Sequence, residues 1–198
     1  MVHFPRSTIQ LCVTLLIACG SAPAPDDSID TVVAHESAIN KSERLYCGLI
    51  VHRVMIAGSP PVYSIMVEAV NCGDPRKYIE IGRSIGHDPV LALVESELGV
   101  VATYTQKQSI SGSSPITLGL VHVEPTSLTI VRRTNLAVPF GAGNVYSGTP
   151  LVDEDGTTLL VSGTKSGVFQ GEVGNSNNYA AIYADFFTST KAPTIYTY

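Results

Sequence analysis

A serine on a short turn is the residue in this chain whose type and setting best suit covalent chemistry. Ser147 is followed by Gly148 and Pro150, and an Asp-Gly pair at 155–156 then separates two β-rich apolar runs. An Asp-Gly pair between such runs is a strong β-hairpin signal. The pattern therefore predicts a serine hydroxyl at the mouth of a cleft, although a serine before a glycine is also an ordinary turn. A serine acts as a nucleophile only where a neighbouring base takes its proton.

The segments that must hold this turn have the pattern of short β-strands. From Leu45 onward, apolar, β-branched and aromatic runs alternate with Gly, Pro, Asn, Asp and Ser, without an extended 3.6-residue period. This pattern predicts an all-β domain, but periodicity does not choose between a sandwich and a closed barrel. The polar stretch 106–115 is the best candidate for a boundary between two halves. The expected strands are 45–57, 62–70, 78–81, 90–94, 99–105, 116–123, 127–133, 151–152, 157–162, 167–173 and 179–187.

Two segments resemble the trypsin-like (chymotrypsin-fold) serine proteases. The family's nucleophile segment runs glycine, aspartate, serine, glycine, glycine, proline, and the serine, the next glycine and the proline are present at Ser147, Gly148 and Pro150. Upstream, residues 67–82 resemble the family's alanine, alanine, histidine, cysteine block and the strand after it. In that block Asn71 stands at the histidine position.

The resemblance implies a fold and a set of site residues. The fold would be two six-stranded antiparallel β-barrels within a domain at 37–198, the first at about 37–107 and the second at about 114–190. A peptide or protein ligand would bind in the cleft between the barrels. The implied site residues are Ser147 for the nucleophile, Asn71 for the base, Asp88 for the orienting acid, the amides of Val145 and Ser147 for the oxyanion hole, and Gly141 for the pocket floor.

Departures from the family pattern predict that catalysis is impaired. The Asn71 amide does not accept a proton near neutral pH, so Ser147 would lack a general base. Val145 replaces a glycine of the oxyanion hole, and Tyr146 replaces the family's aspartate. Asp88 precedes a proline and is also an ordinary turn residue. We therefore expect a binding or scaffold module, with two alternatives: a working serine endopeptidase whose base comes from elsewhere, and an unrelated β-sandwich lipoprotein with a structural role.

Residues 1–18 resemble a bacterial lipoprotein signal peptide. Arg6 precedes an apolar run at 9–17, which is far shorter than the roughly 20 residues of a membrane-spanning helix. The run ends in Leu-Ile-Ala-Cys at 16–19, which resembles the lipobox and implies lipid on Cys19. The mature chain would then be anchored to a membrane through Cys19, followed by a flexible tether at 19–36. We expect an outer-membrane or cell-surface lipoprotein, with a secreted or periplasmic protein as the alternative.

Cysteines, charges and histidines limit the partners further. An exported chain is in an oxidising compartment, so we expect a disulfide between Cys47 and Cys72, worth about 3 kcal/mol for a loop of about 25 residues.

Removing the signal peptide removes one of 12 basic and none of 17 acidic residues, which leaves a net charge of −6 and disfavours a nucleic-acid partner. No histidine has a His, Cys or Glu partner at metal-ligand spacing, and we expect neither a metal nor a cofactor. The histidines weighed as bases or ligands are His35, His52, His87 and His122.

Overall fold

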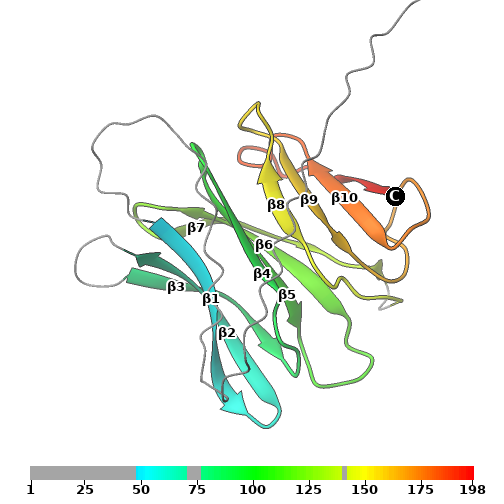
Figure 1. Cartoon of the computed structure of the whole chain (residues 1–198), viewed down its shortest axis with the longest axis horizontal. Coiled ribbons are helices and arrows are strands. Elements are labelled where there is room, and N and C mark those ends of the chain that lie inside the picture. The colour runs from blue at the N-terminus through cyan, green and yellow to red at the C-terminus, as the bar shows by residue number, and fades with distance from the viewer. Residues whose placement is uncertain (1–47, 71–76, 140–141) are drawn as a thin grey trace, which may run out of the picture.

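The computed structural model describes residues 48–70, 77–139 and 142–198, and within these ranges the strands form three antiparallel sheets (Figure 1). The first sheet has the order β1-β2-β3, from β1 (Gly48–Gly58), β2 (Pro61–Val70) and β3 (Lys77–Ile85). The second has the order β4-β5-β6-β7, from β4 (Leu91–Ser96), β5 (Gly99–Lys107), β6 (Ile116–Glu124) and β7 (Thr129–Leu136). The third has the order β11-β10-β9-β8, from β8 (Thr149–Val152), β9 (Leu159–Thr164), β10 (Asn178–Tyr183) and β11 (Thr194–Thr197).

The all-β, antiparallel class expected from the sequence is confirmed, and β1 to β10 correspond to expected strands. The strand expected at 167–173 was wrong, because that segment is irregular, with one turn at 170–171 and a single isolated bridge from Val173 to Tyr196 of β11. Gly167 and Gly171 both have a φ of 75°, a left-handed conformation that an extended strand does not adopt. Strand β11, which is only four residues long, was not predicted from the sequence.

The described residues form sheets of three or four strands and not the two six-stranded barrels that the resemblance implied. The expected boundary at 106–115 joins β5 to β6, which pair directly from Val100↔Val123 to Lys107↔Ile116. That polar stretch is therefore the turn of a hairpin within one sheet. Alternating hydrophobicity tells which face of a strand is buried, but not whether the sheet that it belongs to closes into a barrel.

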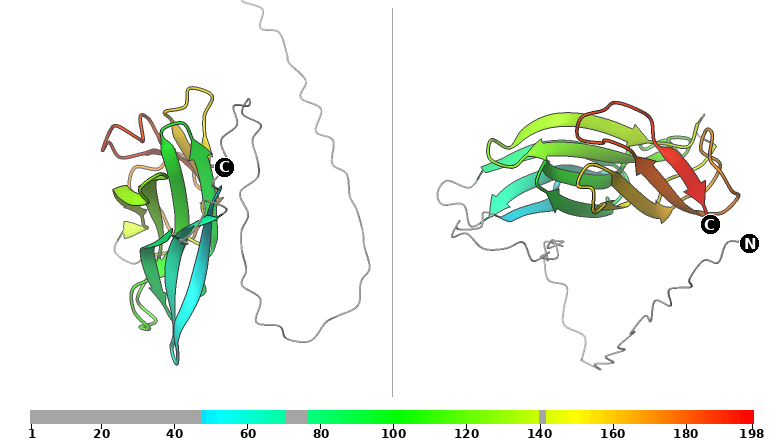
Figure 2. Two further views of the ribbon diagram at one scale, coloured as in Figure 1. Left: turned by 90° about the vertical axis from the view of Figure 1, so that its left-hand side faces the viewer. Right: turned by 90° about the horizontal axis from the view of Figure 1, so that it is seen from above.

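The middle sheet carries a hydrophobic core on each of its faces, and in Figure 1 it lies between the other two sheets. Figure 2 shows the same sheets from the side and from above. One core joins the middle sheet to β1–β3 and includes Val51, Ile65, Ile81, Ala102 and Val121. The other joins it to β8–β11 and includes Val101, Leu120, Val161, Tyr179 and Tyr183. The middle sheet is therefore the element on which both outer sheets depend.

Strand β5 shows how one strand serves two cores. Its first eight residues are all buried, which is typical of a strand covered on both faces. Val100, Ala102 and Tyr104 belong to the core against β1–β3, whereas Val101 belongs to the core against β8–β11. Because side chains alternate along a strand, Thr103 lies on the Val101 face. Its hydroxyl donates to the carbonyl of Gly148 at 2.5 Å, directly in front of β8.

Tyr104 fills a space left by two glycines. Its ring lies over Gly119, the residue opposite it on β6, and over Gly82 on β3. A Cβ atom would come within 2.4 Å of the ring at Gly119 and within 2.5 Å at Gly82. The Tyr104 hydroxyl donates to the Ile81 carbonyl at 2.8 Å, and burial raises its pKa. The ring thereby ties the first sheet to the middle one.

Arg132 of β7 anchors the connection between β10 and β11. Its guanidinium donates to the carbonyls of Phe186 and Ser189 and lies 4.6 Å from the centre of the Phe186 ring. His122, directly opposite Arg132 on β6, packs edge-on against Phe187 at a ring-centroid distance of 5.0 Å. These contacts hold the connection after β10 against the middle sheet.

We expect Gly119→Ala to lower the free energy of unfolding by about 1 to 3 kcal/mol, because the added methyl group overpacks the space under Tyr104. Chemical denaturation of both proteins measures the change. Gly112→Ala is the matched control, since nothing lies within 4 Å of its added Cβ, and it should change stability by less than about 0.5 kcal/mol. Equal effects of the two substitutions would contradict this account of the Tyr104 packing.

Candidate functional site

Ser147 lies in an extended segment that precedes β8 and runs beside the end of β9. The amide of Tyr146 donates to the Thr164 carbonyl at 2.8 Å, and Val145 forms an antiparallel bridge with Lys165. On the other side, the Val145 amide donates to the Ile116 carbonyl of β6 at 2.9 Å. The Ser147 segment is therefore hydrogen-bonded both to the middle sheet and to the third sheet.

The hydroxyl of Ser147 is occupied by Thr164. Its Oγ accepts a hydrogen bond from the Thr164 amide at 3.0 Å and lies 3.1 Å from the Thr164 hydroxyl. In the described part of the chain, these are the hydrogen-bond partners of Ser147 Oγ, and neither can act as a general base near neutral pH. The local geometry thus gives the serine a role in joining β8 to the end of β9.

The backbone around Ser147 is packed too closely to admit a ligand between it and its neighbours. The Ser147 carbonyl accepts the Tyr179 hydroxyl at 2.8 Å, and burial raises the pKa of Tyr179. A Cβ atom on Gly163 would come within 2.1 Å of that carbonyl oxygen. A Cβ atom on Gly148 would come within 2.2 Å of the Leu118 side chain. Both glycines are therefore needed for close packing of chain against chain.

Of the two amides expected to line the oxyanion hole, those of Val145 and Ser147, the Val145 amide is directed elsewhere. An oxyanion hole needs backbone N–H groups aimed at the place where negative charge develops. The Val145 amide already donates to Ile116, within the contact that fixes the segment to β6. Val145 itself is fully buried, in the core between the middle and third sheets. Val145 therefore fixes the serine segment in the core between these two sheets.

Asp88 contacts an arginine and not a histidine near the serine. Arg53 holds it through Nε–Oδ1 at 2.6 Å and a second bond at 3.0 Å to Oδ2. The Asp88 side chain is 59% exposed, and it follows β3 in the turn that leads to β4. The bidentate geometry indicates that Asp88 stabilises this turn by bonding to β1.

Two described histidines, His87 and His122, lie on the face of the middle sheet that packs against the third sheet, and His87 is the one beside Thr105 of β5. Its Nε2 lies 3.0 Å from the hydroxyl of Thr105, two residues along β5 from the Thr103 that bonds to Gly148. Burial lowers the pKa of His87, and the nearby Asp88 opposes that effect. From the sequence, His87 was one of four histidines weighed as bases or ligands, and nothing distinguished it from the others. The resemblance to the proteases pointed instead to the neighbouring Asp88, as the orienting acid.

Five of the expected site residues lie outside the described residues. They are Asn71 at the histidine position, Gly141 at the pocket floor, Cys19 for the lipid, and Cys47 and Cys72 for the disulfide. The roles expected for them stay predictions.

Lys165, beside Thr164, forms a buried ion pair with Glu172. Their side chains are 2% and 3% exposed, and the Lys165 ammonium lies 3.1 Å from a Glu172 carboxylate oxygen. The ammonium also donates to the Gly167 carbonyl at 2.6 Å. The same carboxylate oxygen of Glu172 accepts a hydrogen bond from the Phe169 amide at 2.8 Å. The pair therefore fixes the 165–172 loop, and its amine is directed toward that loop.

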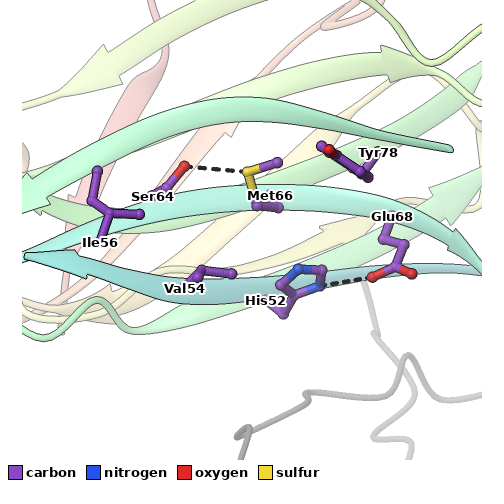
Figure 3. Close-up of a pocket in the computed structure, with 7 residues that line it drawn as sticks. All are labelled: His52, Val54, Ile56, Ser64, Met66, Glu68 and Tyr78. Carbon is purple, nitrogen blue, oxygen red and sulfur yellow. Dashed lines mark hydrogen bonds and ion pairs between the residues drawn. The ribbon is translucent and has the colours of Figure 1, made fainter. Parts of the chain in front are cut away.

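A groove lies on the outer face of the first sheet, on the side away from its core. Figure 3 shows the lining side chains, which come from three strands, and the groove has a volume of about 400 Å³. The cross-strand pairs His52↔Met66 and Val54↔Ser64 place these side chains on one face. The lining residues are His52, Val54, Ile56, Ser64, Met66, Glu68 and Tyr78.

The groove has a polar end and an apolar end. At the polar end, His52 Nδ1 lies 3.6 Å from a Glu68 carboxylate oxygen, and the two side chains are only 12% and 14% exposed. At the apolar end, Val54 and Ile56 are 46% and 51% exposed. A volume of this size falls in the range of about 300 to 1,000 Å³ that is typical of small-ligand sites. The groove is therefore large enough to hold a small ligand or part of a longer one.

This groove was not predicted from the sequence, although the sequence carries a signal for it. A strand with one face in water alternates apolar and polar residues, whereas the run from Ile50 to Ile56 is apolar at three of its four even positions. The odd position Val51 is also buried in the core, so both faces of β1 carry apolar side chains. A half-exposed strand that is apolar on both faces indicates an uncovered surface.

The comparisons with known proteins gave no relative. No family model matches the chain, and neither a curated protein nor a solved structure matches it. In residues 48–70, 77–139 and 142–198 no helix has the length and apolarity needed to cross a membrane. In the same part of the chain, no group of three or more His, Cys, Asp and Glu side chains is arranged to hold a metal ion.

We expect the hairpin turn after Ser147 to lose stability in acid through Asp155. Its carboxylate accepts the amides of Thr157 and Thr158 and the Thr158 hydroxyl, which lowers its pKa from 3.8 to about 2. Because the folded-state pKa is the lower one, this contribution is present above about pH 4 and is lost as the pH falls toward 2.

Melting temperatures of the wild-type protein and Asp155→Asn, measured from pH 7 to pH 2, test this expectation. The variant should melt at a lower temperature above pH 4, and the difference should close as the pH falls toward 2. Glu154→Gln, next to it in the same exposed turn, is the control and should leave no such pH-dependent difference. A constant gap between wild type and Asp155→Asn across this range would contradict the assignment.

Proposed function

We propose that this protein is a non-catalytic binding module of the cell envelope, tethered to a membrane by lipid on Cys19. The observation that carries the proposal is the Ser147 hydroxyl, which is bonded to the amide and hydroxyl of Thr164. A serine nucleophile needs a base on its proton and free amides near the developing oxyanion. Thr164 supplies no base, and the Val145 amide is bonded to Ile116.

A distant relation to the trypsin-like proteases is part of this proposal. It is supported by the order of features around Ser147, where an extended turn leads to β8, an acidic turn, and the antiparallel partner β9. Under it, the resemblance reflects an ancestral site whose serine now serves packing.

The groove on the outer face of β1–β3 is the ligand site in this proposal, and its ligand is an extended peptide or protein segment. Apolar side chains at one end and the His52–Glu68 pair at the other suit a segment with both apolar and polar groups. Tyr78, 66% exposed at the margin, offers an aromatic face of the kind enriched in binding sites. The space around Ser147 is filled by the chain itself, which favours the groove over the region next to the serine.

An active serine endopeptidase is the second candidate, and one observation favours it. His87 lies on Thr105, on the same face of β5 as the Thr103 that bonds to Gly148. Burial lowers the pKa of His87, so the imidazole would be neutral and able to accept a proton at pH 7. In this candidate the imidazole would have to move from Thr105 to the Ser147 hydroxyl.

A fluorophosphonate probe tests whether Ser147 is a nucleophile. We expect no covalent label on the wild-type protein under conditions that label an active serine protease in the same tube, because no base activates the hydroxyl. Ser147→Ala is the background control. Labelling of Ser147 would contradict the proposal, and its loss in His87→Ala would favour the endopeptidase with His87 as the base.

Peptide arrays test the groove as the ligand site. We expect peptides that bind the wild-type protein to bind Tyr78→Ala and Met66→Asp at least about tenfold more weakly, which corresponds to the loss of about 1.4 kcal/mol. Ser147→Ala should bind as the wild type does, since the serine is on another sheet. Binding lost in Ser147→Ala and kept in both groove variants would place the ligand site at the serine instead.

A further inference from the structure

We propose that the end of the β1–β2 hairpin inserts into the surface of a lipid bilayer. The inserting surface, called the apolar tip, consists of residues 54–57 of β1 and Ile110 of the β5–β6 connection. The apolar tip is a different surface from the groove proposed as the ligand site, because Met55 and Ile110 do not line the groove. Figures 1 and 2 show this hairpin, in cyan, projecting from the end of the molecule.

The apolar tip is exposed on both faces of its hairpin. Val54 and Ile56 face the groove side and are 46% and 51% exposed. Met55 points to the opposite face and is 60% exposed. A groove on one face accounts for Val54 and Ile56 but not for Met55. A medium that surrounds the hairpin, as the upper part of a bilayer does, covers both faces at once.

A second hairpin adds to the same surface. The Gly86 amide donates to the Pro61 carbonyl at 2.7 Å, beside the β1–β2 turn. A Cβ atom on Gly86 would lie 3.5 Å from the Ile110 side chain, so Ile110 stands next to that turn. Ile110 is 63% exposed. Two loops far apart in the sequence therefore present large apolar side chains at one end of the molecule.

The charges around the apolar tip fit a lipid surface. The fourteen residues from Val54 to Val67 include no Asp, Glu, Lys or Arg. Three basic side chains lie at the base of the tip, one from each of β1, β3 and β5: Arg53, which is ion-paired with Asp88, Arg83, which is ion-paired with Glu80, and Lys107. Arg53 lies 6.0 Å from the ring centre of Tyr63, which pairs with Met55. An uncharged apolar end, with an aromatic ring and charged groups only at its base, is typical of elements that sit in the headgroup region.

The tether length is compatible with this contact, a point that rests on the proposed lipid at Cys19. The 29 residues from Cys19 to Cys47 can span up to roughly 95 Å, and β1 measures about 35 Å from Gly48 to its tip. The chain is thus long enough for the apolar tip to reach the membrane that holds the lipid. A lipid and an inserted hairpin together give the two signals that stable anchoring requires.

Tryptophan fluorescence tests the proposal, because the chain contains no tryptophan. The protein is the mature chain carrying Cys19→Ser, so binding cannot come from a lipid anchor. Met55→Trp should show a blue-shifted emission on addition of phosphatidylethanolamine–phosphatidylglycerol vesicles, and quenching when the acyl chains are brominated. Val131→Trp, at a β7 residue of 55% exposure, should show neither.

Vesicle flotation of two double variants completes the test. Met55→Ser/Ile110→Ser should reduce the vesicle-bound fraction at least tenfold, whereas Val131→Ser/Leu151→Ser, which removes side chains of 55% and 57% exposure, should leave it unchanged. Equal emission at the two reporter positions, or equal flotation of the two double variants, would overturn the proposal. A blue shift of Met55→Trp that appears without vesicles and grows with protein concentration would assign the tip to a second copy of the chain, and would overturn it too.

Discussion

Strand β5 has to be buried on both of its faces, and the other contacts of the fold follow from that requirement. Its even-numbered residues pack against β1–β3, and its odd-numbered residues face β8–β11. From the same strand, Tyr104 bonds to the Ile81 carbonyl and Thr103 bonds to the Gly148 carbonyl. The outer sheets have three and four strands. Among the described residues, each outer sheet has one hydrophobic core, and that core lies between it and the middle sheet. Loss of the middle sheet would leave both outer sheets with an uncovered apolar face.

This arrangement explains why the serine segment is rigid. Val145, Tyr146, Ser147 and Gly148 each bond to a neighbouring element through backbone or side chain, on the middle sheet or on the third. A hydrogen bond of this kind contributes about 0.5 to 1.5 kcal/mol, and several together fix the segment in one conformation. The sequence pattern that resembles a catalytic turn thus coincides with a turn that the packing needs. The bonds of Ser147 to Thr164 give this serine a structural use.

The sequence predicted the class of the fold well, because alternation and turn residues act locally. The Asp155-Gly156 signal correctly marked the hairpin between β8 and β9. The way in which the sheets pack depends on contacts between distant strands, such as Thr103 with Gly148, which no local pattern encodes. For the same reason, the sequence alone did not show that Ser147 bonds to Thr164, or that Asp88 pairs with Arg53. The groove could not be predicted from the sequence, because exposed apolar residues on β1 cannot be told from core residues until the uncovered face of the sheet is known.

The stability of Ser147 variants tests most directly the claim that this serine serves structure. The free energies of unfolding of Ser147→Ala, Thr164→Val and the double variant form a double-mutant cycle. The account predicts that each single variant is less stable by about 0.5 to 1.5 kcal/mol, and that the double variant loses less than the sum, because both residues share one contact. An unchanged or more stable Ser147→Ala, as is common when a strained active-site residue is removed, would contradict it.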